Sequence, residues 1–328
     1  MTTIDCTWLS FDAAAEVERI VARLREILSR DLKRRGLVVG LSGGIDSSVT
    51  AALGVRAFGA DRVFGLLMPE KQSDPDTLAI SQIVAEALGL EFAHEDISAI
   101  LESVGFYRRY DDAVRELVPQ FADDWKSKVV IQNGGDVAGF NYFELVVQSP
   151  SGDILRQRLP LKTYLGIVAS TNFKQRVRKM LEYYHADRLN FAVAGTPNRL
   201  EYDQGFFVKN GDGSADVKPI AHLYKSQVYE LGAYLKVPEK VRNRLPTTDT
   251  YSLAQAQDEF YFLVPYHQMD LCLYAKNNGI SLEETVRVSG LSVDKVQRVW
   301  IDIDRKRAAT RYHHLQAVLV ADVPEIAL

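Results

Sequence analysis

Residues 37–96 alternate short apolar runs with segments whose apolar residues recur at helical spacing, and this alternation restricts the fold more than any other feature of the chain. A helix is also expected within residues 11–35, ahead of the first apolar run. Strands and helices that alternate with short links are typical of a parallel sheet covered by helices on both faces. We therefore expect an α/β protein built on a doubly wound parallel sheet, with strands at 37–41, 62–68 and 91–96 and helices at 47–58 and 76–88.

The alternation stops at about residue 106 and resumes at about residue 162. In between, apolar and polar residues alternate on both sides of a turn at Pro150–Asp153, which predicts a β-hairpin. We interpret 106–161 as an insertion within a single domain that spans 1–328. The expected elements beyond it are a helix at 162–185, a strand at 190–194, a loop at 195–219, a helix at 222–236 and a helical C-terminal part at 265–310.

Charge and hydropathy exclude several classes of protein. The net charge of −4 argues against a broad surface for nucleic acid or anionic membranes. No apolar run approaches the roughly 20 residues that a membrane-spanning helix needs, and the N-terminus lacks the pattern of a secretory signal. Cys6 and Cys272 have no metal-ligand spacing and are interpreted as reduced thiols. We expect a cytoplasmic protein with no membrane partner and no nucleic-acid partner.

The turn Ser42-Gly43-Gly44-Ile45-Asp46-Ser47-Ser48 joins the first predicted strand to a helix. Such a turn directs backbone N–H groups toward a concave surface at a helix N-terminus, which is a favourable place for phosphate. The sequence has no Walker A pattern there, and Asp46 beside a phosphate requires a divalent cation between them. The alternative is structural: a serine or the aspartate caps the helix, and the glycines ease the turn.

The same residues resemble a known motif. The pattern S-G-G-x-D-S after a buried strand is similar to the pyrophosphate loop of the ATP pyrophosphatase superfamily. This resemblance implies a Rossmann-like fold of the ATP pyrophosphatase type. It also implies cleavage of ATP between its α and β phosphates, with adenylation of a substrate oxygen.

A second segment resembles the ammonia-dependent NAD synthetase family. Residues 195–241 match the family patterns G-T-x-x-x-x-E, G-[FY]-F-T-K-x-G-D-G, D-x-x-P-[IL] and L-x-K-x-Q without a gap. The stretches at 172–180 and 246–249 resemble two further family motifs. The resemblance implies amidation of deamido-NAD by ammonia, with Mg²⁺-ATP as co-substrate. It also implies a homodimer and ammonia that is free or supplied by a separate glutaminase.

The resemblance implies roles for individual residues. Without it, Glu201 and Asp212 would be interpreted as solvated loop acids and Lys225 as a surface cation. With it, the expected Mg²⁺ ligands are Asp46 and Glu201, and the expected catalytic residues are Asp46, Glu201, Lys225 and Thr247. The expected ATP-binding residues are Leu41, Ser42, Gly43, Gly44, Asp46, Ser47, Ser48, Met68, Thr196, Lys225 and Thr247. The expected deamido-NAD-binding residues are Asn172, Arg176, Lys209, Asp212 and Asp216.

Three segments depart from the family wording: the insertion at 106–161, the loop MPEKQSDPDT at 68–77, and the stretch after residue 249. They leave two alternatives open. One is a ligase of the same superfamily that activates a different carboxylate or modifies a nucleic acid, which the basic helix segment 174–179 would favour. The other is a non-enzymatic regulator, because residues 281–303 have a helix-turn-helix rhythm. We interpret that rhythm as ordinary helical packing, since the second helix carries Asp294 and Asp302.

Overall fold

A computed structural model describes residues 7–133, 141–244, 250–253 and 261–325. Its main sheet is parallel, with the strand order β3-β2-β1-β7. The strands are β1 (Leu37–Gly40), β2 (Val63–Leu67), β3 (Glu91–His94) and β7 (Ala192–Val193). The parallel α/β architecture predicted from the alternation is therefore confirmed.

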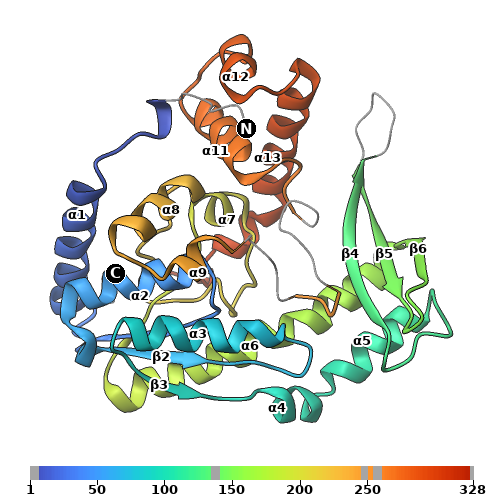
Figure 1. Ribbon diagram of the computed structural model, residues 1–328, viewed down its shortest axis with the longest axis horizontal. Helices are drawn as coiled ribbons and strands as arrows, with labels where there is room; N and C mark the ends of the chain where they lie inside the picture. Colours follow the sequence, from blue (N-terminus) through green and yellow to red (C-terminus); the bar gives the residue numbers. More distant parts are fainter. Residues whose placement is uncertain (1–6, 134–140, 245–249, 254–260, 326–328) are drawn as a thin grey trace.

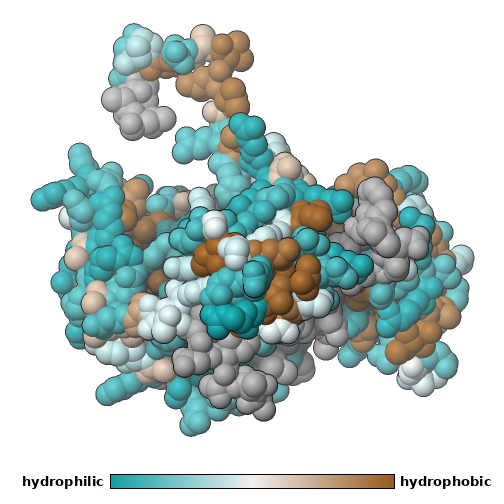
Figure 2. All heavy atoms as spheres, turned by 90° about the horizontal axis from the view of Figure 1, so that it is seen from above, coloured by the Kyte–Doolittle hydropathy of each residue, from teal (hydrophilic) through white to brown (hydrophobic). Residues whose placement is uncertain are grey.

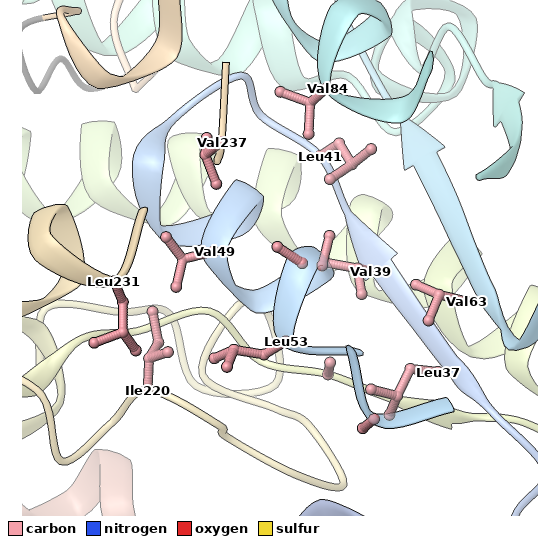
Figure 3. Close-up of a cluster of buried hydrophobic side chains, with 14 of the residues drawn as sticks. Leu37, Val39, Leu41, Val49, Leu53, Val63, Val84, Ile220, Leu231 and Val237 are labelled. Atoms are coloured by element: carbon pink, nitrogen blue, oxygen red, sulfur yellow. The ribbon is translucent and has the colours of Figure 1, made fainter. Parts of the chain in front are cut away.

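Alternate residues of β1 enter two different cores, because successive side chains of a strand point to opposite faces. Leu37 and Val39 pack in one cluster, with Leu41 just beyond the strand (Figure 3). Val38 packs in the other cluster. All four side chains are buried, as the unbroken apolar run of this strand predicts.

Helices cover both faces of this sheet. On the Leu37 face lie α1 (Ala13–Glu26), α2 (Ile45–Phe58), α3 (Pro75–Ala87), α8 (Lys225–Tyr234) and α9 (Glu239–Arg242). On the Val38 face lie α4 (Ser98–Ser103), α5 (Phe106–Arg115) and α6 (Leu161–Leu189). The predicted helix within 11–35 is shorter than expected, because α1 passes into a π-helical turn at Ile27–Asp31.

The insertion contains a second sheet that is separate from the first (Figure 1). It is antiparallel, with the order β4-β5-β6, and consists of β4 (Lys126–Asn133), β5 (Asn141–Gln148) and β6 (Ile154–Arg158). The predicted hairpin is confirmed as β5 and β6, and β4 is an additional strand. The sequence did not predict β4, because the lysines at its start and the polar Gln132 and Asn133 at its end leave an apolar run of only three residues, Val129-Val130-Ile131.

The predicted loop 195–219 contains a short helix, α7 (Arg199–Gln204), and the predicted helix at 222–236 begins at Lys225. The C-terminal part is helical as predicted, with α11 (Tyr266–Asn277), α12 (Leu282–Ser289) and α13 (Val293–His314). Its apolar residues form a third core cluster that includes Val288 and Val296. The helix-turn-helix rhythm thus reflects packing, as we interpreted it.

The chain leaves α13 as an exposed segment, residues 315–325, that extends away from the body (Figure 2). Its apolar residues Val318 and Leu319 are 83% and 60% exposed. None of the helices in the described ranges combines the length and the apolar character that crossing a membrane requires.

Candidate active site

A cavity of about 1120 Å³ lies at the carboxyl ends of β1 and β2, where open α/β sheets usually bind their ligands. It brings together residues from both halves of the chain. The predicted site residues that line it are Leu41, Ser42, Gly44, Asp46, Ser47, Met68, Asn172, Arg176, Thr196, Glu201, Lys209, Asp212 and Lys225.

The turn before α2 has the geometry of an anion site and lacks that of a side-chain cap. Gly44 is the N-cap residue, and no side chain among the described residues caps the helix. The alternative that a serine or Asp46 caps it is therefore wrong. The first N–H groups of α2 remain available to a bound anion.

Glycine at position 43 fits the turn closely. Its φ is +70°, and a Cβ there would lie 3.2 Å from Thr77 O of α3. Ser42 and Ser47 line the cavity with hydroxyl oxygens 3.2 Å apart. Ser48 is buried and donates its hydroxyl hydrogen to Gly44 O at 2.8 Å. Gly43 and Ser48 therefore shape the turn without lining the cavity.

Three segments meet at Asp46. Lys225, at the first position of α8, is buried and forms an ion pair with the Asp46 carboxylate, so its interpretation as a surface cation is wrong. Asn198 donates its side-chain N–H to Asp46 Oδ1 at 3.1 Å. The Asn198 backbone N–H donates to Glu201 Oε2 at 3.1 Å, which completes a capping box at the start of α7. One asparagine thus holds both predicted metal-binding carboxylates.

The charges in this cluster are mutually dependent. Burial and the nearby Asp46 carboxylate raise the pKa of Glu201, against the lowering effect of Lys225. Burial alone would lower the pKa of Lys225, but the charges of Asp46 and Glu201 outweigh it and raise that pKa. Two carboxylates around a single buried ammonium create a demand for additional positive charge.

These residues fit a magnesium ion that is shared with a nucleotide. Mg²⁺ is usually held by one or two carboxylates, with water and substrate phosphates as its other ligands. Asp46 and Glu201 provide two carboxylates beside the helix N-terminus, and both accept hydrogen bonds from Asn198. Within the described ranges, no three His, Cys, Asp or Glu side chains gather as an all-protein metal site.

Helix α6 forms one side of the cavity, and sequence reasoning missed several of its contributions. Lys174 pairs with Glu70 at 2.6 Å, and Lys179 pairs with Glu182 at 2.6 Å, all four side chains being buried. Arg178 donates to Met68 O at 3.2 Å. Lys174, Lys179 and Glu182 were visible in the sequence, but the charged residues of this helix look like an exposed face until the helix is placed.

The predicted deamido-NAD residues have different environments. Asn172 and Arg176 line the cavity from α6, and Asp212 accepts the Val208 N–H at 2.7 Å, while burial raises its pKa. Lys209 lines the cavity too, but its ammonium donates to the carbonyls of Tyr312 and Leu315 at the end of α13.

Besides Gly43 and Ser48, one further predicted residue of the described ranges, Asp216, does not line the cavity. The Asp216 carboxylate accepts the Val193 N–H of β7 at 2.7 Å and the Tyr183 hydroxyl at 3.2 Å, outside the cavity lining. Thr247 lies outside the described residues.

Comparison with known proteins gives consistent matches. The sequence profile of the family described as NAD synthase matches residues 16–121 and 153–311. The chain is 60% identical to the NH(3)-dependent NAD(+) synthetase of Rhizobium meliloti (strain 1021), over 97% of this chain and 95% of that protein. It is 35% identical to the protein of the same name from Thermotoga maritima, over 83% of this chain and 91% of that protein.

Solved structures share the fold at lower identity. The NMN synthetase of Francisella tularensis superposes with a TM-score of 0.64 at 23% identity, covering 94% of this chain and 99% of that one. The NH3-dependent NAD synthetase of Campylobacter jejuni superposes with a TM-score of 0.61 at 22% identity, covering 95% and 100%.

Proposed function

Because this chain belongs to the NAD synthase family, we propose that the cavity beside α2 is where its ATP and its dinucleotide substrate react. The chain is a ligase that forms a carbon–nitrogen bond: it converts deamido-NAD to NAD with ammonia and ATP, and releases AMP and pyrophosphate. The observation that carries the assignment of the site is the Asp46–Lys225 pair next to an uncapped helix N-terminus.

The N-terminus of α2 and the hydroxyls of Ser42 and Ser47 would hold the phosphates of ATP, because they present N–H and O–H donors to one concave surface. Leu41, Met68 and Thr196 would surround the rest of the nucleotide. Asp46 and Glu201 would hold Mg²⁺, which when bound supplies positive charge to the phosphate oxygens.

Lys225 would act where negative charge develops. A carboxylate oxygen of the nicotinate ring forms a bond to the α-phosphorus while the bond between the α-phosphorus and the bridging oxygen breaks, and pyrophosphate leaves. A fixed ammonium beside the phosphates stabilises the charge that collects on them during this step. Thr247 would contribute a hydroxyl at the same phosphates.

The second step needs no nucleophile from the protein. Ammonia adds to the carbonyl carbon of the adenylate, AMP leaves with the carbon–oxygen bond electrons, and one proton is lost to give the amide. Water competes with ammonia for this carbon, so the site must exclude it. The segment from Gly205 to Asp212 lines the cavity and is attached to α13 through Lys209, which suits it to cover the site.

Asn172, Arg176 and Asp212 would face the dinucleotide from α6 and the loop after α7. Lys209 and Asp216 would contribute to dinucleotide binding indirectly, through the hydrogen bonds by which Lys209 holds the end of α13 and Asp216 holds β7. We also propose a single domain with the insertion at 106–161 and the helical part at 265–310, a homodimer, a cytoplasmic location, and ammonia that is free or delivered by a separate glutaminase. Light scattering of the purified protein tests the dimer.

The test of the site is a comparison of two aspartates. Purified protein with Mg²⁺-ATP, ammonium and deamido-NAD should form NAD, AMP and pyrophosphate in equal amounts. Asp46→Ala should abolish pyrophosphate release, and Asp61→Ala, an exposed acid at the opposite end of β2, should not change it. Full activity of Asp46→Ala would refute the proposed site. Activity only with another carboxylate would refute the substrate and keep the site.

A further inference from the structure

The three segments that depart from the family wording are joined to one another in the structure. Tyr107 of the insertion donates its hydroxyl to Glu70 of the loop after β2 at 2.9 Å. Ser127 of β4 donates its N–H to Ser252 Oγ at 3.0 Å and accepts the Leu253 N–H at 3.1 Å. Departures at three places in the sequence therefore form one connected structural unit.

This unit forms an apolar wall of the active-site cavity. Ile131 of β4 and Phe143 of β5 are directly opposite in the sheet register and share one face of it. The Phe143 ring stacks on Tyr164 of α6, with centroids 4.2 Å apart and planes 14° from parallel. Ile131, Phe143 and Tyr164, here called the aromatic wall, all line the cavity. The family profile does not match residues 122–152, which include two of the three.

The aromatic wall lies far from the turn before α2. Tyr164 and Glu182 share one stripe of α6, because a step of 18 residues is five whole turns of a helix, and Asn172 lines the cavity from a position between them. Glu182 marks the ATP end, since a Cβ placed on Gly40 of β1 would lie 2.9 Å from Glu182 Oε1. Eighteen residues of helix separate Tyr164 from Glu182 by about 27 Å. The cavity therefore runs along α6 from the turn to the aromatic wall.

We propose that the aromatic wall binds the adenine ring of deamido-NAD, an inference that rests on the proposed function. The reacting nicotinate carboxylate must lie at the ATP α-phosphorus, beside the turn, so the adenosine half of the dinucleotide is the end directed away from it. Asn172 of α6 lines the cavity between the two ends. A flat aromatic and aliphatic surface is the surface on which a purine ring stacks.

Substitutions at Phe143 separate ring stacking from mere space filling. Phe143→Ala should raise the KM for deamido-NAD about 5- to 100-fold and leave the KM for ATP and kcat at saturation within about twofold. Phe143→Tyr should restore the KM, and Phe143→Leu, which retains apolar volume without a ring, should not. Tyr142→Ala is the matched control, because this neighbour on β5 lies against the Arg158 guanidinium and outside the cavity lining.

ADP-ribose identifies the end of the substrate that stacks, because it carries the adenylate half without the nicotinate. It should inhibit the unmodified protein in competition with deamido-NAD, and Phe143→Ala should weaken that inhibition by the same factor by which it raises the KM. An unchanged inhibition constant, or no inhibition of the unmodified protein, would overturn the proposal. Equal KM values for Phe143→Leu and Phe143→Tyr would also overturn it, as would a change in the KM for ATP.

Failure of the proposed function looks different. In that case the unmodified protein forms no NAD from deamido-NAD. If the unmodified protein forms NAD and Phe143→Ala leaves the KM for deamido-NAD unchanged, only the aromatic wall inference is refuted.

Discussion

The Asp46–Lys225 pair allows a sharp test, because its two members differ in exposure. The Lys225 side chain is 3% exposed and the Asp46 side chain is 16% exposed. Asp46→Asn leaves an almost fully buried ammonium facing Glu201. Breaking a buried ion pair in this way costs about 3–5 kcal/mol. We expect the lower end, about 3 kcal/mol, because an asparagine at position 46 retains the hydrogen bond from Asn198 and Glu201 supplies part of the lost charge.

Lys225→Met should cost less, about 1–2 kcal/mol of unfolding free energy, because the carboxylate that it leaves borders the cavity and is reached by water. The double variant removes both charges together. Contacting residues typically couple by about 0.5–3 kcal/mol, so we expect the double variant to lose about 2 kcal/mol less than the sum of the single variants. Activity should fall at least about 10²-fold in all three variants.

The assay combines urea unfolding followed by circular dichroism with pyrophosphate release from Mg²⁺-ATP. The control is the exposed pair Lys276–Asp304 on α11 and α13, at 2.8 Å, whose coupling should stay below about 1 kcal/mol. Strictly additive costs at Asp46 and Lys225 would show that the pair is not coupled in the folded protein. Recovery of activity in the double variant would refute the role of both charges in catalysis.

Three further predictions concern other features of the chain. Gly205→Ala should lower the free energy of unfolding by about 2–4 kcal/mol, because φ at this position is +69° and the added Cβ would lie 2.3 Å from Thr310 Cβ. The control Gly152→Ala, whose added Cβ has no described atom within 4 Å, should lower it by about 1–2 kcal/mol. Equal urea midpoints for the two variants would contradict this. The raised pKa of Glu201 means that its carboxyl keeps a proton to higher pH than a free glutamate does, so Mg²⁺ binding should release a proton and should weaken from pH 8 to pH 6. Calorimetry measures both effects, and Glu201→Gln should abolish the proton release. A Mg²⁺ affinity that does not depend on pH would contradict this prediction. Burial raises the pKa of Cys272 to about 12, so iodoacetamide should label this thiol at pH 8 only after the protein is denatured. Peptide mass spectrometry detects the label, and labelling of Cys272 in the folded protein would disprove its burial.

The sheet and the turn before α2 were predictable because their signals are local. The apolar run of β1 and the glycines after it specify a buried strand and a tight turn within about ten residues. The meeting of Asp46 with Lys225 was predictable only through the family motif, since 179 residues separate them in the chain. The two residues have no local periodicity in common.

Asn198 shows what local reasoning could have found and did not. An asparagine followed three residues later by a glutamate is the signature of a capping box, so α7 was detectable in the sequence. Its second role, the hydrogen bond to Asp46, was not detectable, because it depends on how α7 packs beside α2. The aromatic wall was hidden for the same reason: Phe143 and Tyr164 belong to different elements, and only their stacking reveals a common surface.

Helix α6 has a consequence for how this cavity can change in evolution or by design. A helix alters the distance between two of its residues only in whole steps, and each step of about 1.5 Å also rotates everything beyond it by about 100°. Removing one residue between Tyr164 and Glu182 would therefore turn one end of the stripe out of the cavity. Removing seven would restore the facing and shorten the separation by about 10.5 Å. The length of this cavity along α6 can thus change only in discrete steps. Substrates of intermediate length must be accommodated by the insertion rather than by α6.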